Sequence, residues 1–128
     1  MRTRRLLIAD DEAINREIYR DLFEDVYAVD LVADGEACLA RFNHACPDLL
    51  ILDVAMPGID GIEVCQRVRA SARCADLPIL LVSGFDGERL RERGLAAGAS
   101  AYIAKPFDLG EFEELVANLA GSDAHASA

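Results

Sequence analysis

Several polar side chains stand at the ends of short apolar runs, where they could act together on a ligand. Asp10 and Asp11 follow one run, Asp53 ends a second, Ser83 ends a third, and Lys105 follows a fourth. In a parallel α/β sheet, ligands bind beyond the carboxyl ends of the strands. If the runs are strands of such a sheet, these carboxylates, hydroxyl and ammonium converge on one rim.

Three carboxylates at such a rim would repel one another. At separations of about 4–6 Å, each pair costs on the order of 4 kcal/mol in an effective dielectric of about 20. A divalent cation removes this repulsion, and oxygen ligands with neither His nor Cys suit Mg²⁺ or Mn²⁺. Because Mg²⁺ often keeps waters and a phosphate oxygen beside one or two carboxylates, the sequence predicts a Mg²⁺ site that receives phosphate, with Mn²⁺ possible.

The segment that follows Asp53 predicts a sharp turn. It reads Asp53-Val-Ala-Met-Pro-Gly-Ile-Asp-Gly61, and Pro57 and Gly58 favour a tight turn. Backbone N–H groups in such a turn can face an anion. An acidic side chain and an anion-binding loop are therefore expected side by side.

The elements that must position these residues are short strands alternating with helices. Apolar runs of four to six residues recur between longer helical patterns, which is typical of β-α units around a parallel sheet. Five units fit the 128 residues. The expected strands are Arg5–Asp10, Ala28–Ala33, Leu49–Asp53, Ile79–Ser83 and Ala101–Ala104. The third and fourth are nearly all apolar and should be central.

Acidic residues mark the starts of the helices. Asp60 stands three residues before Glu63, and Asp108 three before Glu111, which predicts capping boxes and helices that begin near 61 and 109. Further helices are expected over 12–24, 35–44 and 87–97, with Asp11, Asp34 and Asp86 as N-caps and Gly98 as a left-handed stop. Gly94 inside the last of them should cost about 0.5–1 kcal/mol relative to Ala.

The composition excludes several classes of protein. With 52% hydrophobic and 28% charged residues, the chain is typical of a globular domain, expected over 1–120 with a flexible tail at 121–128. The net charge of −10 disfavours direct nucleic-acid binding, which depends on cationic groups. Because no apolar run approaches the roughly 18 residues of a membrane span, we expect a cytoplasmic protein without membrane insertion.

The four cysteines do not predict a metal site. Cys38, Cys46, Cys65 and Cys74 are too far apart for the C-x₂-C pairing of zinc sites, and cytoplasmic thiols stay reduced. We expect all four to serve as small apolar side chains, with a redox role as the lesser alternative.

Taken together, these motifs resemble the receiver domains of response regulators in two-component signalling, which are CheY-like. The matching residues are Asp10-Asp11, Asp53 with Met56-Pro57-Gly58, Ser83, and Ala97-Gly-Ala-Ser-Ala-Tyr-Ile-Ala-Lys-Pro-Phe107. They occur in the family's order and spacing over residues 4–120. The resemblance implies a five-stranded, doubly wound (βα)₅ fold with the flavodoxin-like strand order 2-1-3-4-5.

The same resemblance implies the roles of the acidic residues. Asp53 is the expected phosphoacceptor. Asp11 and Asp53 are expected to bind Mg²⁺ directly, Asp10 through water, and Ala55 through its backbone carbonyl. Ser83 and Lys105 are expected to hold the phosphoryl oxygens. A carboxylate is a competent phosphoryl acceptor, and a metal and an ammonium offset charge in the transition state.

The expected donor is a phosphohistidine on a sensor histidine kinase or a phosphotransfer protein. It brings an activated phosphoryl group, so no general base is needed and the chain is not expected to be an enzyme beyond its own phosphorylation and dephosphorylation. Lys105-Pro106 resembles the family's cis peptide bond, which is feasible because proline follows.

The resemblance also implies an output. Ser83 is expected to move toward the phosphoryl group while Tyr102 turns inward, which changes the face made by helix 87–97, strand 101–104 and the helix from 109. This is a population shift between two states, and the face should bind a downstream protein. A monomer or a phosphorylation-dependent dimer is expected.

Two neighbours of the site should influence the lifetime of the phosphate. Ala55 and Phe85 carry apolar side chains that cannot orient an attacking water by hydrogen bonding, which predicts slow self-dephosphorylation. Ser83 stands where many receivers have threonine, so the hydroxyl is kept and a softer switch is expected.

Alternative interpretations stay open. Met1 and the tail favour a stand-alone regulator, although the chain could be a receiver domain excised from a larger regulator or hybrid kinase. Asp53 and Lys105 could form a structural salt bridge. A Mg²⁺-dependent phosphatase that works through an aspartyl-phosphate would need a second acid at the position of Ala55, and a flavodoxin-like cofactor binder would need a Ser/Thr/Gly-rich loop where Asp10-Asp11 stand.

Overall fold

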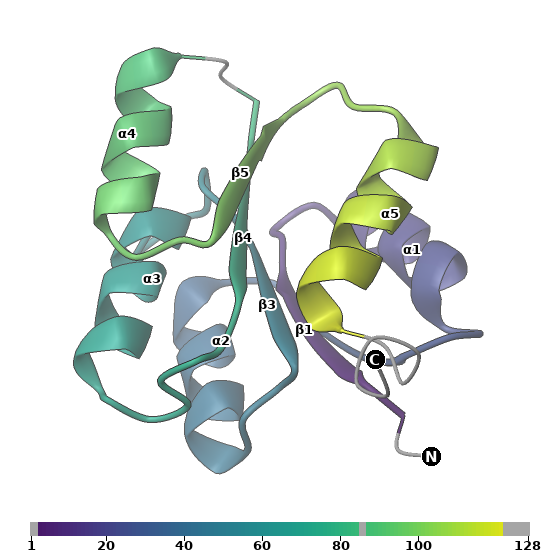
Figure 1. Ribbon diagram of the computed structural model, residues 1–128, viewed down its shortest axis with the longest axis horizontal. Helices are drawn as coiled ribbons and strands as arrows, with labels where there is room; N and C mark the ends of the chain where they lie inside the picture. The colour runs from purple at the N-terminus through teal and green to yellow at the C-terminus, as the bar shows by residue number, and fades with distance from the viewer. Residues whose placement is uncertain (1–2, 85–86, 122–128) are drawn as a thin grey trace.

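Five parallel strands form the centre of the molecule in the order β2-β1-β3-β4-β5 (Figure 1). The computed structural model describes residues 3–84 and 87–121. Its strands are β1 (Arg5–Ala9), β2 (Ala28–Val32), β3 (Leu49–Asp53), β4 (Ile79–Ser83) and β5 (Ala101–Ala104). The predicted fold class and strand order are confirmed, and three strands have the predicted bounds.

Helices cover both faces of the sheet, as Figure 1 shows. They are α1 (Ala13–Phe23), α2 (Gly35–His44), α3 (Gly61–Ala70), α4 (Glu88–Ala96) and α5 (Leu109–Ala120). Helices α1 and α5 lie on one face and α2, α3 and α4 on the other. None of the helices in the described ranges is long and apolar enough to cross a bilayer.

The core is divided in two by the sheet. Alternate residues of a strand point to opposite faces, so Leu49 and Ile51 of β3 pack with Phe112 of α5, whereas Leu50 and Leu52 pack with the residues of α2 and α3. Every residue of β3 and β4 is buried, as expected for interior strands covered on both sides. The two strands that end in Asp53 and Ser83 are therefore held firmly by the core.

Three predicted N-caps are confirmed. The carboxylates of Asp60 and Asp108 accept hydrogen bonds from the N–H of the residue three positions on, at 2.8 and 2.9 Å, and Asp34 accepts one from Ala37 at 2.7 Å. The side chain of Glu63 pairs with Arg67 instead of completing a reciprocal capping box. The predicted left-handed stop is also confirmed, because Gly98 has φ +109° just after α4.

The predicted cap of α1 is wrong. The N-cap is Glu12, whose side chain makes no capping bond, and not Asp11. The physical reason is that the carboxylate of Asp10 accepts a hydrogen bond from the backbone N–H of Glu12 at 2.9 Å. Asp10, which directly follows β1, therefore satisfies the backbone at the start of α1 in place of Asp11. Helix α4 begins one residue later than predicted, after Gly87, and Asp86 lies outside the described residues.

The prediction for the cysteines is wrong in two of the four cases. Cys38 and Cys65 are buried apolar side chains as expected, but Cys46 and Cys74 form a disulfide, with their Cα atoms 6.3 Å apart. The bond joins the α2–β3 loop to the α3–β4 loop. The two loops precede neighbouring parallel strands and so lie at the same end of the sheet. The spacing of the cysteines along the chain does not reveal that the two side chains lie within bonding distance.

Two glycines allow helices to approach the sheet closely. A Cβ on Gly61 would lie 2.4 Å from the carbonyl oxygen of Asp53, and a Cβ on Gly94 would lie 2.6 Å from the Leu81 side chain. The N–H of Gly61 also donates to the carbonyl of Val54 at 2.9 Å. Gly61 thus fixes the start of α3 against the end of β3, and Gly94 brings α4 onto β4.

We expect Gly61→Ala to lower the free energy of unfolding by about 2 kcal/mol or more, because the added Cβ meets rigid backbone that cannot move aside. Urea unfolding of the variant and the parent measures the difference. Gly84→Ala is the control, since no atom lies within 4 Å of its added Cβ. Equal stability of Gly61→Ala and the parent would contradict the close approach.

Candidate functional site

Four strands deliver polar side chains to one end of the sheet. Asp53 and Ser83 are the last residues of β3 and β4, while Asp10 and Lys105 directly follow β1 and β5. One carboxylate oxygen each of Asp10, Asp11 and Asp53 lie within 4.8 Å of one another. The structure therefore brings together the acidic residues that the sequence singles out.

Lys105 reaches into this acidic cluster. Its Nζ lies 3.3 Å from Oδ2 of Asp53, to which it donates a hydrogen bond, and 3.8 Å from Oδ2 of Asp10. The peptide bond between Lys105 and Pro106 is cis. One ammonium offsets only part of the charge of three carboxylates, so the cluster keeps a negative charge that favours a cation.

The environment of Asp53 disfavours its charged form. The residue is 5% exposed, and burial first and the charge of Asp10 second raise the pKa of the carboxyl above its ordinary value. The ammonium of Lys105 and the N–H of Ala55, which bonds the carboxylate, act in the opposite direction without cancelling the shift. A buried carboxylate in this state gains from a cation placed beside it.

Asp10 is fully buried and is held by neighbours that sequence reasoning missed. Nδ2 of Asn15 donates to Oδ2 of Asp10 at 3.2 Å, and Nη1 of Arg16 donates to its backbone carbonyl at 2.8 Å. Both residues lie in the first turns of α1, where side chains lean back toward the N-terminus and so toward the strand end. Their spacing of five and six residues from Asp10 is the signal that could have found them.

A surface groove of about 330 Å³ opens beside Lys105. Its walls come from α1, from the segment between β5 and α5, and from the first residue of α5, and they include Ile18, Tyr19, Phe107 and Leu109. Burial, followed by the charges of Asp10 and Asp53, raises the pKa of Tyr19, so its hydroxyl stays neutral. The groove is mostly apolar and adjoins the acidic cluster.

The remaining predicted site residues lie around this centre. Ser83 is buried at the end of β4, and Ala55 is exposed two residues after Asp53. Tyr102 is half-buried in β5, with its ring close to Gly94 of α4. Phe85 lies outside the described residues.

The donor set fits a hard divalent cation. Three carboxylate oxygens gather within 4.8 Å, no His or Cys belongs to the group, and Asp11 remains exposed to solvent at its edge. Oxygen ligands with open positions for water suit Mg²⁺ or Mn²⁺ better than zinc or copper. The exposed side would leave room for a further oxygen ligand from outside the protein.

Comparisons with known proteins agree with one another. Residues 6–117 match the family model of the response regulator receiver domain. The chain is 41% identical over 119 residues to the response regulator MprA of Mycobacterium tuberculosis (strain ATCC 25618 / H37Rv), covering 93% of this chain and 50% of that protein. The chain thus spans about half the length of the curated relatives it matches.

Solved structures show the same fold. A putative response regulator from Chloroflexus aurantiacus J-10-fl superimposes with a TM-score of 0.87 at 36% identity, covering 93% of this chain and 98% of that chain. The chemotaxis protein CheY4 of Vibrio cholerae gives a TM-score of 0.86 at 28% identity, covering 92% and 99%.

We expect Asp53→Asn to raise the free energy of unfolding of the metal-free protein at neutral pH, by on the order of 1 kcal/mol. The pKa of Asp53 in the folded protein lies above its unfolded value of about 3.9. Ionisation of Asp53 therefore lowers the free energy of unfolding. This loss is absent below the pKa of Asp53 in the unfolded chain, grows with pH, and is complete above its pKa in the folded protein.

Urea unfolding at neutral and at acidic pH measures this effect. The free energy of unfolding of Asp53→Asn should exceed that of the parent at neutral pH, and the difference should disappear in acid. Asp76→Asn, in the exposed part of the α3–β4 loop, is the matched control and should change little. A loss of stability at neutral pH, or a gain that is the same in acid, would contradict the assignment.

Proposed function

The chain belongs to the response-regulator receiver family, and from this we propose that it is a signalling switch that accepts a phosphoryl group on Asp53. The observation that carries the proposal is the convergence of Asp10, Asp11 and Asp53 with Lys105 at the strand ends. A structural salt bridge would need one acid for one ammonium. The surplus of acids supports a site built for a cation and an anion together.

Mg²⁺ is the proposed cofactor, with Mn²⁺ as a substitute. Asp11 and Asp53 would bind it directly, Ala55 through its carbonyl, and Asp10 through a water. When bound, the ion supplies positive charge that offsets the charge of the carboxylates and of the phosphoryl oxygens. Asn15 and Arg16 serve this arrangement by fixing the orientation of Asp10.

The phosphoryl transfer needs little from the protein beyond geometry and charge. A carboxylate oxygen of Asp53 attacks phosphorus, and the bond from phosphorus to the histidine nitrogen of the donor breaks. Lys105 already lies 3.3 Å from Asp53, where its ammonium can offset charge on a phosphoryl oxygen, and the Ser83 hydroxyl would hold another. Because the attacking group is an anion and imidazole is the leaving group, no general base is required.

We propose that the groove beside Lys105 is the docking site of the phosphodonor. Ile18 and Leu109 line it and are 42% and 48% exposed, and Ile14 of α1 is 62% exposed. Apolar side chains exposed together next to a reactive centre are typical of a protein docking site. We propose that a sensor histidine kinase or a phosphotransfer protein covers these residues and presents its phosphohistidine to Asp53.

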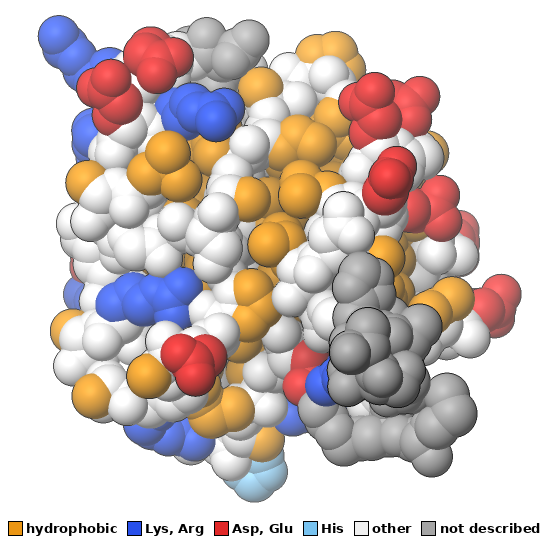
Figure 2. All heavy atoms as spheres, in the orientation of Figure 1, with side chains coloured by type: hydrophobic (Ala, Val, Ile, Leu, Met, Phe, Trp, Pro, Cys, Tyr) orange, Lys and Arg blue, Asp and Glu red, His pale blue; other side chains and the backbone are white. Residues whose placement is uncertain are grey.

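The proposed output face consists of α4, β5 and α5. Figure 2 shows a band of hydrophobic side chains between α4 and α5, over the edge strand β5. Tyr102 lies in this strand, half-buried and close to Gly94, while Ser83 ends the neighbouring strand β4. A shift of Ser83 toward the phosphoryl group would draw Tyr102 inward and change the surface offered to a downstream protein.

Phosphorylation by acetyl phosphate tests the proposal. With Mg²⁺, the parent should gain one phosphoryl group by intact-protein mass spectrometry, and Asp53→Asn should gain none, because the attacking carboxylate is missing. Asp76→Asn, at the other end of the sheet, should react like the parent. A chelator should abolish the reaction in the parent. Equal labelling of Asp53→Asn and the parent would overturn the assignment.

The phosphoryl group should be lost slowly, over minutes or longer and not within seconds. The side chain of Ala55 is exposed beside Asp53 and cannot orient an attacking water. Ala55→Gln should accelerate the loss by on the order of tenfold, because the amide can hold the water. The decay of phosphoprotein measures the rate, with the exposed Ala75→Gln as control. Loss from the parent within seconds would contradict the prediction.

A further inference from the structure

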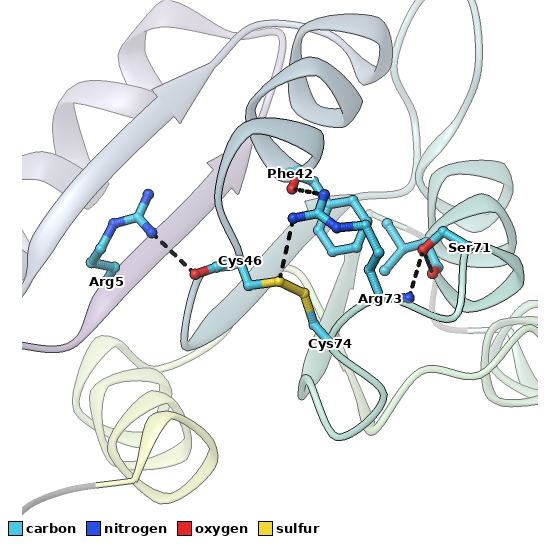
Figure 3. Close-up of a disulfide and its surroundings, with 7 residues drawn as sticks. Arg5, Phe42, Cys46, Ser71, Arg73 and Cys74 are labelled. Atoms are coloured by element: carbon cyan, nitrogen blue, oxygen red, sulfur yellow. Dashed lines mark hydrogen bonds between the residues drawn. A yellow bond between two sulfur atoms is a disulfide. The ribbon is translucent and has the colours of Figure 1, made fainter.

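The disulfide between Cys46 and Cys74, drawn in Figure 3, lies at the end of the sheet where β3 and β4 begin. Cys46 stands shortly before β3 and Cys74 shortly before β4, whereas Asp53 and Ser83 end the same two strands. The bond therefore occupies a place that phosphoryl chemistry does not use. The disulfide and its surroundings are therefore separate from the proposed phosphorylation site.

A cationic side chain is fixed beside one sulfur atom. Nη2 of Arg73 lies 3.8 Å from Sγ of Cys46. Figure 3 marks this contact with a dashed line. The guanidinium is held there because Nη1 donates to the carbonyl of Phe42 at 2.7 Å and its Cζ lies 5.2 Å from the centre of the Phe42 ring. A fixed positive charge next to a thiol favours the thiolate, which is the form that reacts with oxidants.

The chain holds two classes of cysteine. Cys46 is exposed and Cys74 is half-buried, so solvent reaches the pair. Cys38 and Cys65 are fully buried, and burial raises the pKa of the Cys38 thiol to about 12 and that of the Cys65 thiol above its ordinary value. The buried thiols are therefore protonated and shielded, and they provide an internal control.

The loop that carries Cys74 is held in an uncommon backbone conformation. Ala72 and Cys74 have φ of +60° and +51°, values that residues other than glycine rarely adopt. The hydroxyl of Ser71 accepts from the N–H of Arg73 at 3.2 Å, and the carbonyl of Cys74 accepts from the N–H of Leu77 at 2.9 Å. These bonds fix the loop with Cys74 opposite Cys46, and the guanidinium of Arg73 reaches both Cys46 and Phe42.

We propose that Cys46 and Cys74 form a reversible oxidation site whose substrate is hydrogen peroxide. The Cys46 thiolate attacks one peroxide oxygen, the O–O bond breaks, and the products are a sulfenic acid on Cys46 and hydroxide, which takes up a proton to give water. The Cys74 thiol then attacks the Cys46 sulfur, the S–O bond breaks, and a second water leaves. Two thiols lose two electrons in total, and one peroxide is reduced to two waters.

The bond also closes a loop of the chain around the phosphorylation site. Its ends are 28 residues apart, and the loop contains β3, Asp53 and α3. A cross-link of this length restricts the unfolded chain, so the oxidised protein should melt about 5–15 °C higher than the reduced one. A Cys46→Ser, Cys74→Ser double variant should show no such difference.

The test starts from the full chain reduced with dithiothreitol and freed of it. One equivalent of hydrogen peroxide should cause loss of two hydrogens by mass, and peptide mapping after alkylation should find Cys46 joined to Cys74 with Cys38 and Cys65 still free. In Cys74→Ser, dimedone should trap the sulfenic acid on Cys46. The proposal is overturned if the parent forms no such bond, or if Cys38 and Cys65 are oxidised as fast.

Variants of Arg73 test the role of the charge. Arg73→Ala should slow the trapping of sulfenic acid about two- to fivefold, because one charge at this distance in a solvated place has an effect of this size. Arg73→Lys should keep most of the rate, and Arg67→Ala, which removes an exposed arginine paired with Glu63, should match the parent. An equal rate of sulfenic acid trapping in Arg73→Ala and the parent would show that Arg73 does not assist the oxidation of Cys46.

Labelling of Asp53 by acetyl phosphate in the oxidised and the reduced protein separates this inference from the proposed function. If Asp53 is labelled in both states while peroxide joins the cysteines, both proposals stand. Failure of the labelling leaves the peroxide result intact, and failure of the oxidation leaves the labelling intact.

Discussion

The mutual repulsion of three carboxylates at the strand ends is the constraint on which the rest of the structure depends. Asp10 and Asp53 are buried beside the core, where an ionised acid without a matching cation is costly. Lys105 offsets only part of that cost. Such an arrangement persists only where the surrounding structure leaves the side chains no alternative position.

The sheet provides that rigidity. β3 and β4 are buried along their whole length between two apolar layers, so their last residues cannot retreat without disturbing the core. Gly61, at the start of α3, packs against the backbone of Asp53 and fixes the loop between them. The backbone N–H of Ala55 forms a hydrogen bond with the carboxylate of Asp53. The stability of the core thus holds an unfavourable arrangement of charge in place, a compromise common at functional sites.

The sequence predicted well whatever depends on local pattern. The apolar runs that stop at Asp53 and Ser83 predict the ends of β3 and β4 to the residue. The caps at Asp60 and Asp108 follow from a Glu three residues later, and the cap at Asp34 follows from an acid directly before a helical pattern. The sequence does not predict the start of α1 correctly, because the side chain of Asp10, two residues before the N-cap Glu12, bonds the backbone there.

Features that depend on how distant segments meet were not predicted. The pairing of Cys46 with Cys74 depends on the conformation of two loops that lie far apart along the chain. The contact of Asn15 with Asp10 is local, and its spacing of five residues is the only signal for it in the sequence. Gly94 was expected only as a weak point of its helix. The structure shows that the missing side chain lets α4 lie on Leu81.

The shortness of β5 limits how other molecules can use the open border of the sheet. The strand has four residues and pairs with β4 on one side only, so its outer border offers an incoming chain about two N–H donors. A ladder of this length offers an added strand little main-chain pairing at β5, and short edge strands are one way in which proteins disfavour edge-to-edge association. Selectivity at this border must therefore come from side-chain shape and not from main-chain pairing.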